Sequence, residues 1–106
     1  MLPINMDTML GIAGEAYDAV LEKVPSDQLA KRWINTIARA VQEFETNPFI
    51  SYRTQDNTLI FWSHDTTNGI YEVTEKGCEC KAARKHQPCK HAAARKLYRR
   101  YLETAQ

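Results

Sequence analysis

The residues best suited to chemistry lie within one short segment, from Gly77 to His91. This segment contains Cys78, Cys80, Cys89 and His91, which form a Cys-x-Cys pair, an eight-residue gap and a Cys-x-His pair. Zinc is usually held by four cysteine or histidine ligands in a tetrahedron, and three thiolates with one imidazole meet that requirement. We therefore predict a structural metal site made of these four residues. Zn²⁺ is the expected ion, with an iron–sulfur centre as the alternative.

Two further interpretations stay open for this segment. The thiols could be unrelated, although reduced cysteines are usually buried singly rather than grouped. His86 is the rival fourth ligand, but it lies only three residues before Cys89 and Pro88 stiffens the chain between them. We therefore favour His91.

The use of cysteine also bears on the cell compartment. The three cysteines are an odd number and all lie in this segment, and the first basic residue is Lys23, so we expect no signal peptide. Grouped cysteines without a secretion signal favour a metal over disulfide bonds, which indicates a reducing cytoplasm. No apolar run approaches the roughly 20 residues of a membrane-spanning helix, so we expect no membrane association.

The basic residues are concentrated around the cysteine segment. The formal net charge is +1, yet residues 76–100 carry nine Lys and Arg residues against one acidic residue, Glu79, whereas residues 1–75 are acidic. Such a split is typical of a region that binds a polyanion, and the alternative is a solvated basic face. The candidate phosphate contacts are Lys81, Arg84, Lys85, Lys90, Arg95, Lys96, Arg99 and Arg100.

The elements that position these residues follow from the periodicity. Apolar residues at helical spacing predict a first helix that Asp7 or Thr8 caps and that runs to about Val24, where Pro25 ends it. Ser26 caps a second helix, which Asn47 and Pro48 stop. Its predicted core stripe is Leu29, Trp33, Ile37, Val41 and Phe44.

From residue 49 the spacing changes from 3.6 toward two residues. Segments 49–54, 58–63 and 70–74 predict three short strands joined by tight turns, as in an antiparallel meander. A last helix is predicted from Pro88 or Cys89 to Leu102, with His91, Leu97 and Tyr98 on its buried arc. The cations Arg95, Lys96, Arg99 and Arg100 fill the opposite arc.

The fold prediction is therefore an α+β protein. It has an N-terminal helical hairpin, a short antiparallel meander and a C-terminal helix joined by the zinc site. The 106 residues suit one compact domain, with a helical part at 1–48 and the meander, zinc segment and last helix at 49–106. Leu, Ile, Val and Phe number only 21, and so lean a core favours a metal staple.

The Cys-x-Cys and Cys-x-His pairs, with a strand before them and a Pro88-Cys89-Lys90-His91 helix start, resemble the SWIM zinc finger over residues 57–102. The resemblance implies a small ββα zinc unit with a role in DNA binding or protein–protein interaction. Nothing in residues 1–48 shares in it.

Three function classes remain after these observations. A DNA-binding module with little sequence specificity is favoured, because the cations surround the zinc segment. The alternative is a protein-interaction adaptor that uses the finger or the acidic helical half. An enzyme is not expected, because four protein ligands leave a zinc no open position for a substrate or water, so no small-molecule substrate is expected either.

Overall fold

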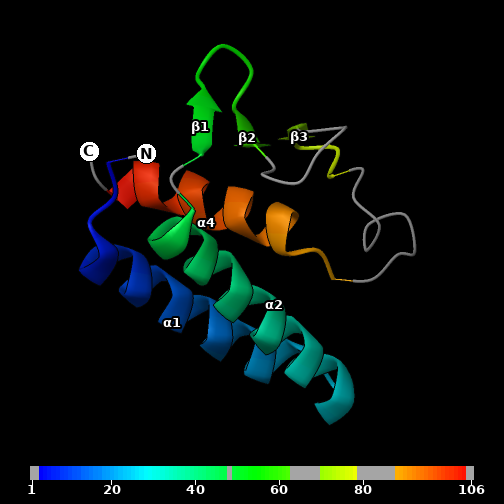
Figure 1. Cartoon of the computed structure of the whole chain (residues 1–106). Helices are drawn as coiled ribbons and strands as arrows, with labels where there is room; N and C mark the ends of the chain where they lie inside the picture. The colour runs from blue at the N-terminus through cyan, green and yellow to red at the C-terminus, as the bar shows by residue number, and fades with distance from the viewer. Residues whose placement is uncertain (1–2, 48, 63–69, 79–87, 105–106) are drawn as a thin grey trace.

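The fold was obtained as a computed structural model, which describes residues 3–47, 49–62, 70–78 and 88–104. Two antiparallel helices, a three-stranded antiparallel sheet and a C-terminal helix follow one another along the chain (Figure 1). The predicted α+β class and order of elements are therefore confirmed. The elements are α1 (Met6–Lys23), α2 (Asp27–Thr46), β1 (Ile50–Arg53), β2 (Thr58–Trp62), β3 (Ile70–Val73) and α4 (Lys90–Thr104).

The ends of the helical hairpin are set by local capping. The side chain of Asn5 accepts hydrogen bonds from the backbone N–H groups of Asp7 and Thr8, so Asn5 is the cap and the predicted cap at Asp7 or Thr8 was wrong by two or three residues. An Asn side chain reaches the unpaired amides of the first turn as well as Asp or Thr would. Ser26 caps α2 as predicted, with its hydroxyl accepting from Leu29 N–H.

The apolar stripes of α1 and α2 are buried only along part of their length. Ile37, Val41 and Phe44 lie in the core as predicted, but Leu29 is 40% exposed and Leu21 is 64% exposed. Both exposed leucines lie at the end of the hairpin where α1 joins α2, and Figure 1 shows that this end extends beyond α4. Within the described residues, no third element covers the stripes there, and Trp33 is correspondingly only half-buried and lies outside the core cluster.

The sheet is the predicted meander, with strand order β1-β2-β3. Ile50 pairs with Phe61 and Leu59 with Val73, so these four side chains share the face that packs on the helices. The turn between β1 and β2 contains Asn57 at φ +54°, a conformation that Asn adopts more readily than most residues. The positive φ expected at Asn68 and Gly69 falls outside the described residues.

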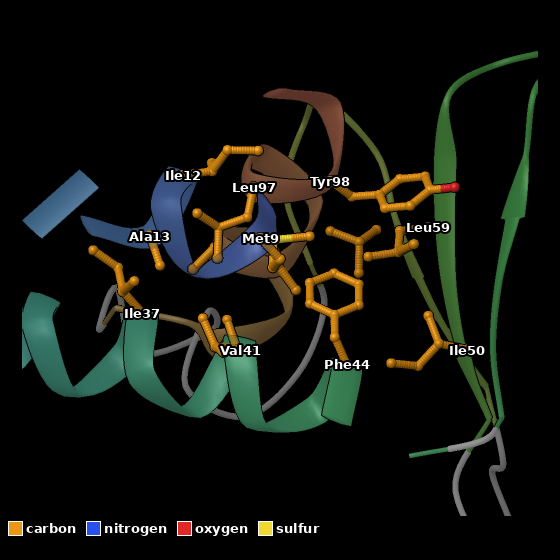
Figure 2. Close-up of a cluster of buried hydrophobic side chains, with 14 of the residues drawn as sticks. Met9, Ile12, Ala13, Ile37, Val41, Phe44, Ile50, Leu59, Leu97 and Tyr98 are labelled. Carbon is orange, nitrogen blue, oxygen red and sulfur yellow. The ribbon is translucent and has the colours of Figure 1, made fainter. Parts of the chain in front are cut away.

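Helix α4 is the central element of the molecule. It crosses both helices of the hairpin and also contacts β2 and β3. Its Leu97 and Tyr98 meet side chains from α1, α2, β1 and β2 in one core (Figure 2). The segments 1–48 and 49–106 thus contribute to a single hydrophobic cluster. None of the helices in the described ranges has the length and apolar character needed to span a bilayer.

Candidate metal centre

Cys78 is positioned by a tight turn at the end of β3. Thr74 and Gly77 form an isolated antiparallel bridge, with N–H to carbonyl distances of 3.0 and 3.2 Å. Gly77 has φ +113°, which side-chain-bearing residues rarely adopt, so glycine is the residue suited to this reversal. The turn sends the chain back toward α4 and places the half-buried Cys78 beside it.

Cys89 and His91 are positioned by the first turn of α4. The Cys89 carbonyl accepts the Ala93 N–H at 3.0 Å, so Cys89 stands at the helix start, where its side chain is 6% exposed. His91 follows two residues later and is half-buried. A strand end and a helix start therefore bring Cys78, Cys89 and His91 to the same point, as the sequence predicted.

The three donor atoms have the spacing of a metal site. His91 Nδ1 lies 3.7 Å from Cys78 Sγ and 3.8 Å from Cys89 Sγ, and all three atoms lie within 4.8 Å of one another. A tetrahedral zinc with its usual bond lengths separates sulfur and nitrogen ligands by about 3.5–3.8 Å. The Cys78, Cys89 and His91 group could therefore hold a metal ion.

Several residues of the predicted site fall outside the described parts of the chain. Cys80, the predicted ligand that would complete the set of four, and His86, the rival of His91 for the histidine position, are both among them. The same is true of three candidate phosphate contacts, Lys81, Arg84 and Lys85. The fourth ligand therefore stays a prediction.

The His91 ring is held between two aromatic side chains that the sequence analysis did not single out. Its centroid lies 4.7 Å from that of Phe61 in an edge-on arrangement and 5.0 Å from that of Tyr71 in a stacked one. Phe61 and Tyr71 are cross-strand partners on β2 and β3. This packing restricts the imidazole ring to an orientation in which Nδ1 faces the two sulfur atoms. The alternation of side chains along β2 and β3 could have indicated that Phe61 and Tyr71 share one face of the sheet.

Lys90, between Cys89 and His91, forms an ion pair with Glu43. Its ammonium lies 2.7 Å from the Glu43 carboxylate, whose other oxygen accepts from the Asn47 side-chain amide. Partial burial raises the pKa of Glu43, but these two hydrogen bonds and the Lys90 charge outweigh it, so the pKa is below its ordinary value. The pair ties the start of α4 to α2.

The predicted row of four cations on α4 was wrong for Arg95. This side chain is 8% exposed, and its Nε–H donates to the Asn57 carbonyl at 2.9 Å. Because α4 is covered by helices on one side and by the sheet and the β1–β2 turn on another, its buried arc is wider than one apolar stripe indicates. Arg100 pairs with Glu15 at 3.2 Å. Lys96 and Arg99 form no ion pair with the residues that the structure describes.

Comparison of the chain with protein-family models, curated proteins and solved structures finds no match.

Proposed function

We propose that the chain is a zinc-stapled α+β module of a reducing cytoplasm that binds nucleic acid with little sequence specificity. The observation that supports it best is the Cys78, Cys89 and His91 group, whose donor atoms suit a tetrahedral ion. We propose Cys80 as the fourth ligand and a SWIM-like finger as the unit that results. With four protein ligands the zinc is structural, so no catalytic role is proposed for it.

The metal proposal is tested by elemental analysis and by two matched histidine variants. We expect one zinc per chain. His91→Ala should weaken zinc affinity by about 100-fold or more in a chelator competition, because even the loss of an outer-shell partner often costs 10- to 100-fold. His86→Ala is the control and should change it little. The reverse ranking would make His86 the histidine ligand in place of His91, and an iron–sulfur absorbance would exclude the zinc site.

The nucleic-acid proposal depends on cations that the fold leaves available. Lys90 and Arg100 are paired with carboxylates and Arg95 is buried, whereas Lys96 is exposed and Arg99 half-buried. Lys96 and Arg99 add to the three cations between Cys78 and Pro88, which are Lys81, Arg84 and Lys85. Together they provide up to five phosphate contacts. Five contacts correspond to a log–log salt slope of about −4 to −5 on duplex DNA.

A salt-titrated DNA-binding curve with matched charge variants tests this proposal. Replacing both Lys96 and Arg99 by Gln should weaken binding to all sequences alike and reduce the slope by about 2, since phosphate contacts carry no sequence information. Replacing Lys23 and Lys31 by Gln removes the same charge elsewhere and should change little. If the parent protein binds no DNA at low salt, the nucleic-acid proposal is rejected.

A protein-interaction adaptor is the second candidate, and the outer face of the sheet favours it. Phe49, Trp62 and Ile70 are between 45% and 49% exposed. Trp62 pairs with Ile70 across the strands, and the backbone N–H of Trp62 donates to the Phe49 carbonyl. The three residues therefore form a row. Absence of salt-sensitive DNA binding would place this candidate first.

A further inference from the structure

The middle of α2 carries a basic surface within the otherwise acidic N-terminal half. Between Asp27 and Glu43 the helix has three cations, Lys31, Arg32 and Arg39, and no acidic residue. The net negative charge of residues 1–75 gives no indication of these three cations. The local charge of one helix would have been the signal for them.

Two of these cations line a shallow, open hollow of about 300 Å³. Arg32 and Arg39 lie two helical turns apart, which corresponds to about 10.5 Å along the axis, and Asn35 and Thr36 lie between them. Pro88, which directly precedes the metal ligand Cys89, closes the hollow on another side. The hollow therefore lies at the edge of the candidate metal centre.

The two guanidinium groups are available to a ligand. Both side chains are on exposed residues, and neither forms an ion pair within the described ranges. Glu43 is placed four residues after Arg39, a spacing at which helical ion pairs form. Its carboxylate is instead held by Lys90 and Asn47. Lys90 thus leaves Arg39 free to bind another anion.

The donors at the hollow suit a phosphate group. A guanidinium presents a planar fork of N–H donors that matches two phosphate oxygens, and the Asn35 amide adds a neutral donor between the two forks. The Thr36 hydroxyl donates to the Arg32 carbonyl at 2.8 Å, so it is already used within the helix. The volume is at the lower end of the range of ligand pockets, about 300 Å³, which fits a small group.

We propose that the hollow of Arg32, Asn35 and Arg39 binds a backbone phosphate of nucleic acid, and so extends the binding surface from the metal centre onto α2. The proposal rests on the nucleic-acid function proposed above and names an additional site for it. The site lies on the helical half, which neither the finger resemblance nor the charge pattern of residues 76–100 includes.

The test compares two variants of the full-length, zinc-loaded protein. Arg32→Gln with Arg39→Gln should weaken binding to labelled duplex DNA by about 10-fold or more at low salt and should reduce the salt slope by about 1, because one phosphate contact is lost. Lys23→Gln with Lys31→Gln removes the same charge, with one change on the same helix, and should leave both quantities nearly unchanged. The thermal midpoint of both variants should match that of the parent, since all four side chains are on exposed residues.

The outcomes separate this proposal from the function on which it rests. If the parent binds DNA and the Arg32/Arg39 variant binds it with the same affinity and slope, the hollow is overturned and the nucleic-acid function stands. If the parent binds no DNA, inorganic phosphate is titrated while the Asn35 side-chain amide is observed by NMR. A saturable shift that the variant lacks would then reassign the hollow to phosphate of another source, such as a phosphorylated protein, and would overturn the nucleic-acid assignment.

Discussion

At the scale of single residues, Arg95 has the environment of a structural side chain. Its Nε–H donates to the Asn57 carbonyl across 38 residues of sequence, and its side chain fills the space between α4 and the β1–β2 turn. We expect Arg95→Ala to lower the free energy of unfolding by about 1–3 kcal/mol, because the carbonyl loses its donor in a partly buried place. Chemical denaturation measures this.

The neighbouring residue provides the control for Arg95. Lys96 carries the same charge but is exposed, so Lys96→Ala should change the stability by no more than about 0.5 kcal/mol. Equal stability of the two variants would contradict the structural role of Arg95. For the same reason, charge reversal at Arg95 is a poor test of DNA binding, since it would disturb the fold.

Asp56 gives a prediction about pH. The Arg53 guanidinium donates two hydrogen bonds to the Asp56 carboxylate. It is the largest of the causes that lower the pKa of Asp56 from 3.8 to about 2, and Thr58 is the next. Because the pKa is lower in the folded protein, folding favours the ionised carboxylate. This contribution is present above about pH 4 and is lost as the pH falls toward 2.

NMR titration of the Asp56 carboxyl measures the effect. In the parent the midpoint should lie near pH 2, and in Arg53→Gln it should move up toward 3.8. Both side chains are substantially exposed, so solvent screens the pair and the effect on overall stability should be small. An unchanged midpoint in the variant would show that Arg53 is not the cause.

At the scale of elements, the candidate metal centre joins the end of β3 to the start of α4. The far half of α4 is held differently, because Ala94, Leu97 and Tyr98 are buried among side chains of the helical hairpin and the sheet. The helix therefore has the candidate metal centre at one end and a hydrophobic core along the rest. The two attachments should respond differently to a chelator.

We expect metal removal to loosen the two ends of this junction first. Hydrogen exchange should become faster around Cys78 and in the first turns of α4, because metal-binding energy contributes to folding in small zinc units. Protection in α2 and in the second half of α4 should largely persist. Mass-spectrometric hydrogen exchange with and without chelator measures this, and uniform loss of protection throughout the chain would contradict it.

At the scale of the whole molecule, stability depends on a core cluster to which each of the described helices and strands contributes. Phe44 is 4% exposed, and its ring centroid lies 6.1 Å from that of Tyr98 on α4. We expect Phe44→Ala to cost roughly 3–5 kcal/mol in thermal or chemical unfolding, because it leaves a cavity where the elements meet. Leu21→Ala, at a residue 64% exposed, should cost no more than about 0.5 kcal/mol.

The half-buried Trp33 provides a further check on this core. Its substitution by alanine should cost less than that of Phe44, since Trp33 lies outside the core cluster. Similar losses for Trp33→Ala and Phe44→Ala would mean that the core extends farther along the hairpin than the buried residues indicate.

The sequence alone determined the kind and order of the elements and three members of the candidate site. Helical periodicity, the Ser26 cap and the Pro25 stop depend on neighbouring residues, so they can be read along the chain. The spacing of Cys78, Cys89 and His91 could be read in the same way. These residues are close in sequence, and a short turn and a helix start limit the positions that their side chains can occupy.

Only the tertiary structure decided which cations stay available and which apolar residues are covered. Arg95 meets Asn57, Lys90 meets Glu43, and Arg100 meets Glu15 across 85 residues. The tertiary structure also decided that Leu21 and Leu29 stay exposed, because α4 crosses the hairpin away from the end where α1 joins α2. Charged residues and apolar stripes can be located along the sequence by their spacing. Which residues they contact depends on how the elements pack, and periodicity does not indicate that packing.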